Sequence, residues 1–95
     1  MKLEIVKSHL PTKKYDAIFT DKGSRKVISF GAAGYSDYTI NKDKSRRQLY
    51  LNRHKKTEDW TNPQTAGSLS RWILWGDSTN IEVNIRQFKT KFNLI

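Results

Sequence analysis

Residues 14–30 read KYDAIFTDKGSRKVISF, two runs rich in apolar and aromatic residues on either side of a short turn. In the first run every second residue of 15–19 is apolar or aromatic, which places these side chains on one face of a strand and leaves Asp16 on the other. Asp21-Lys22-Gly23-Ser24 is typical of a turn in which glycine adopts a positive φ. The stretch therefore predicts an antiparallel β-hairpin whose second strand is Lys26–Phe30.

The residues around the hairpin predict one further strand and two helices. Residues 2–6, KLEIV, alternate between polar and apolar side chains in the same way. A helix is expected from a cap at Asn41 to about Lys56, with a narrow apolar stripe and an exposed basic face. A second helix is expected to begin at Asn62-Pro63 and to stop at Gly76.

The last predicted helix has the clearest start signal. Thr79-Asn80-Ile81-Glu82 matches a capping box, in which side chains satisfy the free N–H groups of the first turn. Apolar residues then recur at helical spacing at Ile81, Ile85, Phe88 and Phe92. The fold class that follows is α+β, with an N-terminal antiparallel β-hairpin or small sheet packed against about three C-terminal helices.

Length and composition favour a single domain over residues 1–95, with three Trp, four Tyr and four Phe to build its core. There is no cysteine, so disulfides and thiolate zinc sites are excluded. No apolar run approaches the roughly 20 residues that span a bilayer, and the N-terminus has no signal-peptide pattern. We therefore expect a soluble protein that acts inside the cell. Its net charge of +9 indicates a polyanionic partner such as nucleic acid, an anionic membrane surface or an acidic protein.

Much of the positive charge lies in the helix predicted after Asn41, where seven basic residues stand against one acidic residue. These candidate nucleic-acid-binding residues are Lys42, Lys44, Arg46, Arg47, Arg53, Lys55 and Lys56. Lysine and arginine neutralise phosphates and release condensed counterions, which gives salt-dependent binding with little sequence specificity. The alternative is that they form an ordinary solvated helix face.

Several aromatic residues and one arginine have two interpretations. Tyr35, Tyr38 and Tyr50 could stack on unpaired bases, or they could pack the hairpin onto the basic helix. Trp75 falls off the apolar stripe of its helix and could be an exposed anchor for another protein, with Arg71 at its rim, or it could belong to the core.

No pattern in the sequence indicates an enzyme. The two histidines are His9 and His54, and His54 lies in a run of cations. The carboxylates that could hold a metal have no recognisable ligand spacing; they are Asp37, Asp43, Glu58 and Asp59. We therefore predict no catalytic residue, no metal site and no cofactor.

Three stretches carry a family resemblance. They are GYSDYTINKDKSRRQLYLNRHKK at 34–56, EDW-x-NP-x-TAG-x-LSRWILWG at 58–76 and N-I-x-x-F-K-x-x-F at 84–92. Together they resemble small uncharacterised proteins encoded by large nucleocytoplasmic DNA viruses of algae and protists. The resemblance implies a viral origin and a place of action in the host cytoplasm or nucleus, or packaged in the virion. It implies no activity, because the function of those proteins is unknown.

Two functional hypotheses follow. The first is a small basic non-enzymatic viral protein that binds nucleic acid or another polyanion through the lysine- and arginine-rich helix. DNA is the favoured ligand. The second is a virion structural or assembly protein, of the minor capsid or core, whose basic face contacts an acidic viral protein. The oligomeric state stays open.

Overall fold

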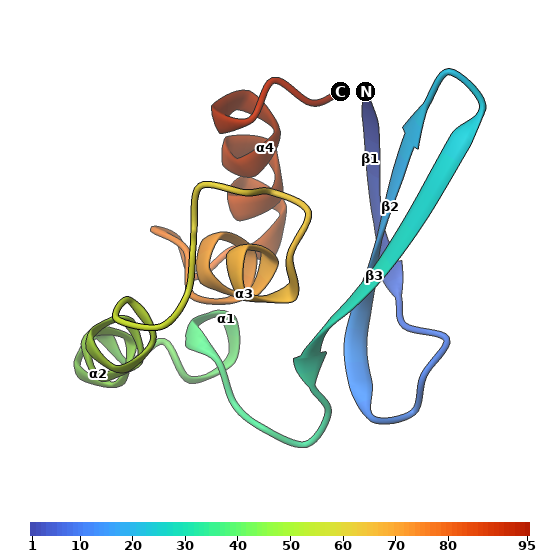
Figure 1. Ribbon diagram of the computed structural model, residues 1–95. Helices are drawn as coiled ribbons and strands as arrows, with labels where there is room; N and C mark the ends of the chain where they lie inside the picture. The colour runs from blue at the N-terminus through green and yellow to red at the C-terminus, as the bar shows by residue number, and fades with distance from the viewer.

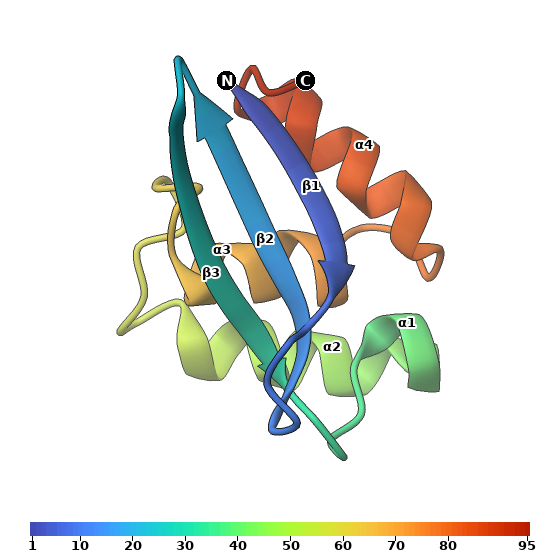
Figure 2. The same ribbon diagram turned by 90° about the vertical axis from the view of Figure 1, so that its right-hand side faces the viewer.

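The three strands of the protein form one antiparallel sheet in the order β1-β2-β3, and the helices cover one face of it (Figure 1, Figure 2). The strands are β1 (Lys2–Lys7), β2 (Lys13–Asp21) and β3 (Ser24–Ala32) in this computed structural model, which describes residues 1–95. The predicted α+β class is confirmed, and the hairpin is part of a three-stranded sheet.

The helical part begins with α1 (Tyr38–Asn41) and α2 (Lys44–His54). The next helix, α3 (Ala66–Leu69), continues into a π-helical segment, η1 (Ser70–Leu74). The last helix is α4 (Ile81–Lys91). In Figure 1, α3 and α4 lie nearest the sheet and α2 lies farther from it.

The hairpin between β2 and β3 has a two-residue turn at Lys22-Gly23, between the paired residues Asp21 and Ser24. Lys22 has φ 48° and Gly23 has φ 85°, and a turn with positive φ at both central residues matches the right-handed twist of the flanking strands. The predicted hairpin is confirmed. Its second strand begins at Ser24, before the predicted Lys26, because this tight turn lets the ladder of hydrogen bonds reach it.

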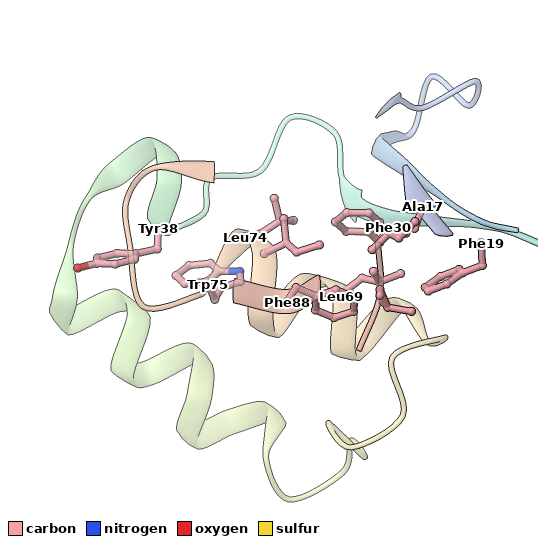
Figure 3. Packing of buried hydrophobic residues seen from close by; sticks show 11 residues of the cluster. Ala17, Phe19, Phe30, Tyr38, Leu69, Leu74, Trp75 and Phe88 are labelled. Carbon is pink, nitrogen blue, oxygen red and sulfur yellow. The ribbon is translucent and has the colours of Figure 1, made fainter. Parts of the chain in front are cut away.

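The core lies between the inner face of the sheet and the α3–η1–α4 layer (Figure 3). The sheet contributes Leu3, Ala17, Phe19 and Phe30, and the helical layer contributes Leu69, Ile73, Leu74 and Phe88. The strand face predicted from residues 15–19 is therefore the buried one. Burial of these large apolar side chains supplies most of the free energy that holds sheet and helices together.

The predicted single helix from Asn41 to Lys56 is wrong, because the chain breaks it at Lys42-Asp43. Lys42 has φ 55°, in the left-handed region, and ends α1. Asp43 is the N-cap of α2, and its carboxylate accepts hydrogen bonds from the backbone N–H groups of Ser45 (2.9 Å) and Arg46 (3.2 Å). The side chain of Asn41 accepts the N–H of Asp43 at 2.8 Å and caps no helix.

Two other predicted helix starts are displaced. The second helix begins at Ala66, capped by Thr65, because Asn62 uses its side-chain oxygen in a local turn with the Gln64 N–H at 3.0 Å. The last helix is capped by Asn80 and not by Thr79. In each case another polar residue nearby, whose side-chain oxygen can also accept a backbone N–H of the first turn, is the N-cap.

Gly76 lies in the turn after η1, as its predicted role as a stop requires, but its φ is not positive. A Cβ at this position would overlap the carbonyl oxygen of Trp72 and the side chain of Asn84. Glycine is needed here for close approach of the backbone and not for a left-handed turn.

Candidate nucleic-acid interface

One side of α2 lines the groove between this helix and the end of the sheet. Arg46, Leu49, Tyr50 and Arg53 share this side, because helical residues three and four apart are neighbours. The opposite wall comes from the end of β3 and the following corner, residues 30–37, together with α3. The groove has a volume of about 560 Å³.

Three cations of the groove are free to meet a ligand. Lys13, Arg46 and Arg53 are exposed, and their side chains make no ion pair or hydrogen bond within the protein. Lys14 is different, because its ammonium lies 2.5 Å from the carboxylate of Asp37 and is 14% exposed.

The two carboxylates of the groove already have partners. Asp37 pairs with Lys14 and also accepts hydrogen bonds from the N–H and hydroxyl of Thr39. Glu58 lies 2.8 Å from Nδ1 of His54 and accepts the indole N–H of Trp60 at 2.9 Å. Lys14 offsets the charge of Asp37, so Lys13, Arg46 and Arg53 stand against Glu58 alone and the net charge that faces the groove is positive.

Arg47, predicted to bind nucleic acid, is bound within the protein. Its Nε donates to the carbonyl oxygens of Trp75 (3.2 Å) and Gly76 (2.9 Å), and its NH2 group donates to Asp77 at 3.0 Å. The guanidinium also lies 5.5 Å from the centre of the Tyr38 ring. Arg47 therefore fastens α2 to the turn after η1, and these contacts occupy the donors that the phosphate-binding prediction requires.

The other predicted cations are exposed but do not share one face. Lys44 and Lys55 lie on the side of α2 opposite to Arg46 and Arg53, because they are about half a helical turn out of phase. Lys42 lies in the link before α2, and Lys56 follows the helix. The structure thus brings Arg46 and Arg53 into the groove together with Lys13, and it separates the remainder from them.

Of the three candidate tyrosines, Tyr35 alone is strongly exposed, at 74%. Tyr38 is buried beneath the Arg47 guanidinium. Tyr50 is stacked between His54 (ring centres 4.2 Å apart) and Trp75 (4.4 Å). Burial raises the pKa of the Tyr50 hydroxyl well above its ordinary value. Tyr35 is therefore the tyrosine that can stack on an unpaired base.

Trp75 lies in the core at 9% exposure, so its interpretation as an exposed partner anchor is wrong (Figure 3). Its ring stacks on Tyr50, within 6° of parallel. Arg71 forms no rim, because it is half-buried and its Nη1 donates to the Trp75 carbonyl at 3.1 Å. The Arg71 guanidinium lies over the rings of Trp72 (4.1 Å) and Trp60 (5.1 Å).

Sequence reasoning missed a second polar cluster, centred on Asp16 on the outer face of the sheet. Its carboxylate accepts hydrogen bonds from the hydroxyls of Ser8 (2.6 Å) and Ser29 (2.7 Å) and lies 2.5 Å from Nδ1 of His9. These bonds, that of His9 first, hold the pKa of Asp16 well below its ordinary value. The signal in the sequence was only an isolated carboxylate within a predicted strand, since its partners Ser8, His9 and Ser29 lie 7 to 13 residues away.

The structure contains no group of three or more histidine and carboxylate side chains that could hold a metal ion. None of its helices has the length and apolar character needed to cross a membrane.

Comparison with known proteins identifies one family. The profile of the family of unknown function DUF5754 matches residues 3–54, which is more than half of the chain and covers the sheet, α1 and α2. No curated protein and no solved structure matches the chain.

Proposed function

The chain belongs to DUF5754, a family of unknown function. We propose that it binds nucleic acid, with DNA as the favoured ligand, without catalysis and largely without sequence specificity. The observation that carries this proposal is the number of unpaired cations. Of the eighteen Lys and Arg side chains, only Lys2, Lys14 and Arg47 take part in ion pairs.

The distribution of acids adds support. The ion pairs above and the histidine contacts occupy five of the nine carboxylates, and Asp43 caps α2. Exposed cations without partners keep their counterions until a polyanion displaces them, and release of these ions favours binding. The proposed binding surface is formed by the exposed cations Arg46 and Arg53 of α2, together with Lys13 from the sheet.

Fluorescence anisotropy with labelled DNA across a salt series tests the proposal. If about three phosphates are neutralised, affinity should fall about 40-fold between about 50 mM and about 200 mM salt. Absence of binding at the lower salt concentration, or an affinity that salt does not change, would rule the proposal out.

The alternative, a virion assembly protein with an acidic protein partner, has less support. The unpaired cations would serve this alternative too, but of the anchor expected for it, Trp75 is buried and Arg71 donates to the Trp75 carbonyl. We also propose, from the sequence resemblance, that the protein is viral and acts in the host cytoplasm or nucleus or in the virion.

A further inference from the structure

We infer that this surface takes a single strand of nucleic acid, which lies in the groove between α2 and the corner after β3, with a base on Tyr35 and phosphates at Lys13, Arg46 and Arg53. The inference rests on the proposed function and names the form of the ligand.

The shape of the groove is the first argument. Its volume of about 560 Å³ falls within the range of about 300–1,000 Å³ that is usual for sites that enclose small ligands. A nucleotide unit of a single strand fits such a space. A duplex keeps its bases stacked inside and meets proteins through convex elements, such as a helix that enters its major groove. Here Arg46 and Arg53 line one wall of the groove and Lys13 the other, an arrangement that suits a flexible single strand better than a rigid duplex.

The exposed aromatic ring is the second argument. Tyr35 follows Gly34, whose φ of 85° turns the chain at the corner, and the Tyr35 hydroxyl makes no hydrogen bond within the protein. Leu49 on α2 lines the same groove and is 63% exposed. An unpaired base offers both faces for stacking, and proteins that bind single strands combine such rings with a basic groove.

Charge is the third argument. The carboxylates of Asp37 and Glu58 would repel phosphate if they were free, but each is bonded within the protein. Lys14 offsets the charge of Asp37, and the Glu58 carboxylate is bonded to the His54 ring and to the Trp60 indole N–H. The cations left over are Lys13 on the sheet side and Arg46 and Arg53 on the helix side, which leaves a path between two basic walls.

The test compares a labelled oligo-dT of about 12 nucleotides with a duplex of the same length by anisotropy at low salt. Wild-type protein should bind the single strand at least about tenfold more tightly than the duplex. An oligo-U of the same length separates RNA from DNA as the source of the strand, and tight binding of either one supports the inference.

A pair of double variants separates groove geometry from charge. Arg46→Gln/Arg53→Gln removes two charges from the groove, and Lys44→Gln/Lys55→Gln removes two charges from the opposite side of the same helix. The first should lower single-strand affinity at least about tenfold and the second less than about threefold. None of the four side chains makes an ion pair or hydrogen bond, so both proteins should fold, and thermal melts check this.

Tyr35 is tested in the same assay. Tyr35→Ala should weaken oligo-dT binding about tenfold, whereas Tyr35→Phe, which keeps the ring, should leave it within about twofold. Ile40→Ala is the matched control, because Ile40 is also a large exposed residue but does not line the groove.

The outcomes distinguish this inference from the proposed function. Equal affinity for duplex and single strand, with equal losses in the two double variants, overturns the inference and leaves salt-dependent binding intact. Failure to bind either oligonucleotide at low salt overturns both.

Discussion

Asp16 holds the chain between β1 and β2 in place through three side chains. Its buried carboxylate accepts hydrogen bonds from Ser8 and Ser29 and contacts His9, so residues of two strands and a loop meet at one acceptor. Because the ionised form accepts these bonds, folding favours ionisation and lowers the pKa of Asp16.

A pH dependence follows with a definite sign. A carboxyl whose pKa is lowered by folding contributes stability above its unfolded pKa of about 3.9, and this stability is lost as pH falls below that value. Melting temperature of the wild type should therefore decrease on acidification from about pH 5 to about pH 2. Asp16→Asn should melt at a lower temperature at neutral pH and show a shallower decrease. Parallel acid profiles for the two proteins would contradict this assignment.

Asn84 has a comparable role inside the helical layer. Its amide group donates to the carbonyl oxygens of Ile73 (2.9 Å) and Ser78 (2.8 Å), and its oxygen accepts the Ser78 N–H at 3.0 Å. Asn84→Ala leaves these buried groups without partners and should lower the free energy of unfolding by about 2–4 kcal/mol in urea titrations. Asn52→Ala, at an exposed position of α2, should change it by less than about 0.5 kcal/mol.

At the scale of elements, α2 is attached by one arginine and one stacked tyrosine. Neighbouring arginines have opposite roles, because Arg47 points to the turn after η1 and Arg46 points to the groove. The helix has no fully buried residue, so its position depends on the contacts of Arg47 and on the stack of Tyr50 with Trp75. This mode of attachment leaves the groove side of α2 open to a ligand.

The two arginines can be compared directly by conservative substitution. Arg47→Lys keeps the charge but loses the planar donors that reach two carbonyl oxygens, and it should lower the free energy of unfolding by about 1–2 kcal/mol. Little of this comes from the pair with Asp77, which is exposed. Arg46→Lys should be close to neutral in the same urea titration. A neutral Arg47→Lys would show that α2 is held mainly by Tyr50.

At the scale of the whole molecule, the two ends of the chain lie side by side and close the fold (Figure 1). The N–H of Leu3 donates to the Ile95 carbonyl at 2.7 Å, and the N–H of Ile95 donates to the Met1 carbonyl at 3.0 Å. Phe88 and Leu94, near the C-terminal end, are buried against the sheet side of the core. The sheet and the last helix are therefore parts of one cooperative unit.

The family match covers fewer residues than the unit that folds, because the core includes residues beyond position 54. Residues 3–54 include the sheet and α2 but none of Leu69, Ile73, Leu74 or Phe88. A fragment of residues 1–57 would expose the apolar face of the sheet and should be unfolded, with no thermal transition in circular dichroism. The full chain should unfold in one transition. A cooperative melt of the fragment would show that the sheet and α2 suffice.

The sequence alone determined the features that depend on near neighbours along the chain. Strand alternation and a two-residue turn predicted the hairpin, and the stripe ending at Phe92 predicted the last helix, because these signals act over two to four residues. The net charge and the excess of cations over acids were also readable in advance. Helix starts were displaced, because several polar side chains compete for each cap and their backbone conformations decide between them.

Only the tertiary structure decided which charged and aromatic side chains are free. Arg46 and Arg47 are adjacent and chemically identical. Arg47 is hydrogen-bonded to the carbonyl of Trp75, some thirty residues away, whereas Arg46 faces the groove without a partner. The groove joins Lys13 and Tyr35 to Arg53 across a long separation in sequence. Such contacts depend on how whole elements dock, and docking follows from the burial of the shared core, which no local pattern specifies.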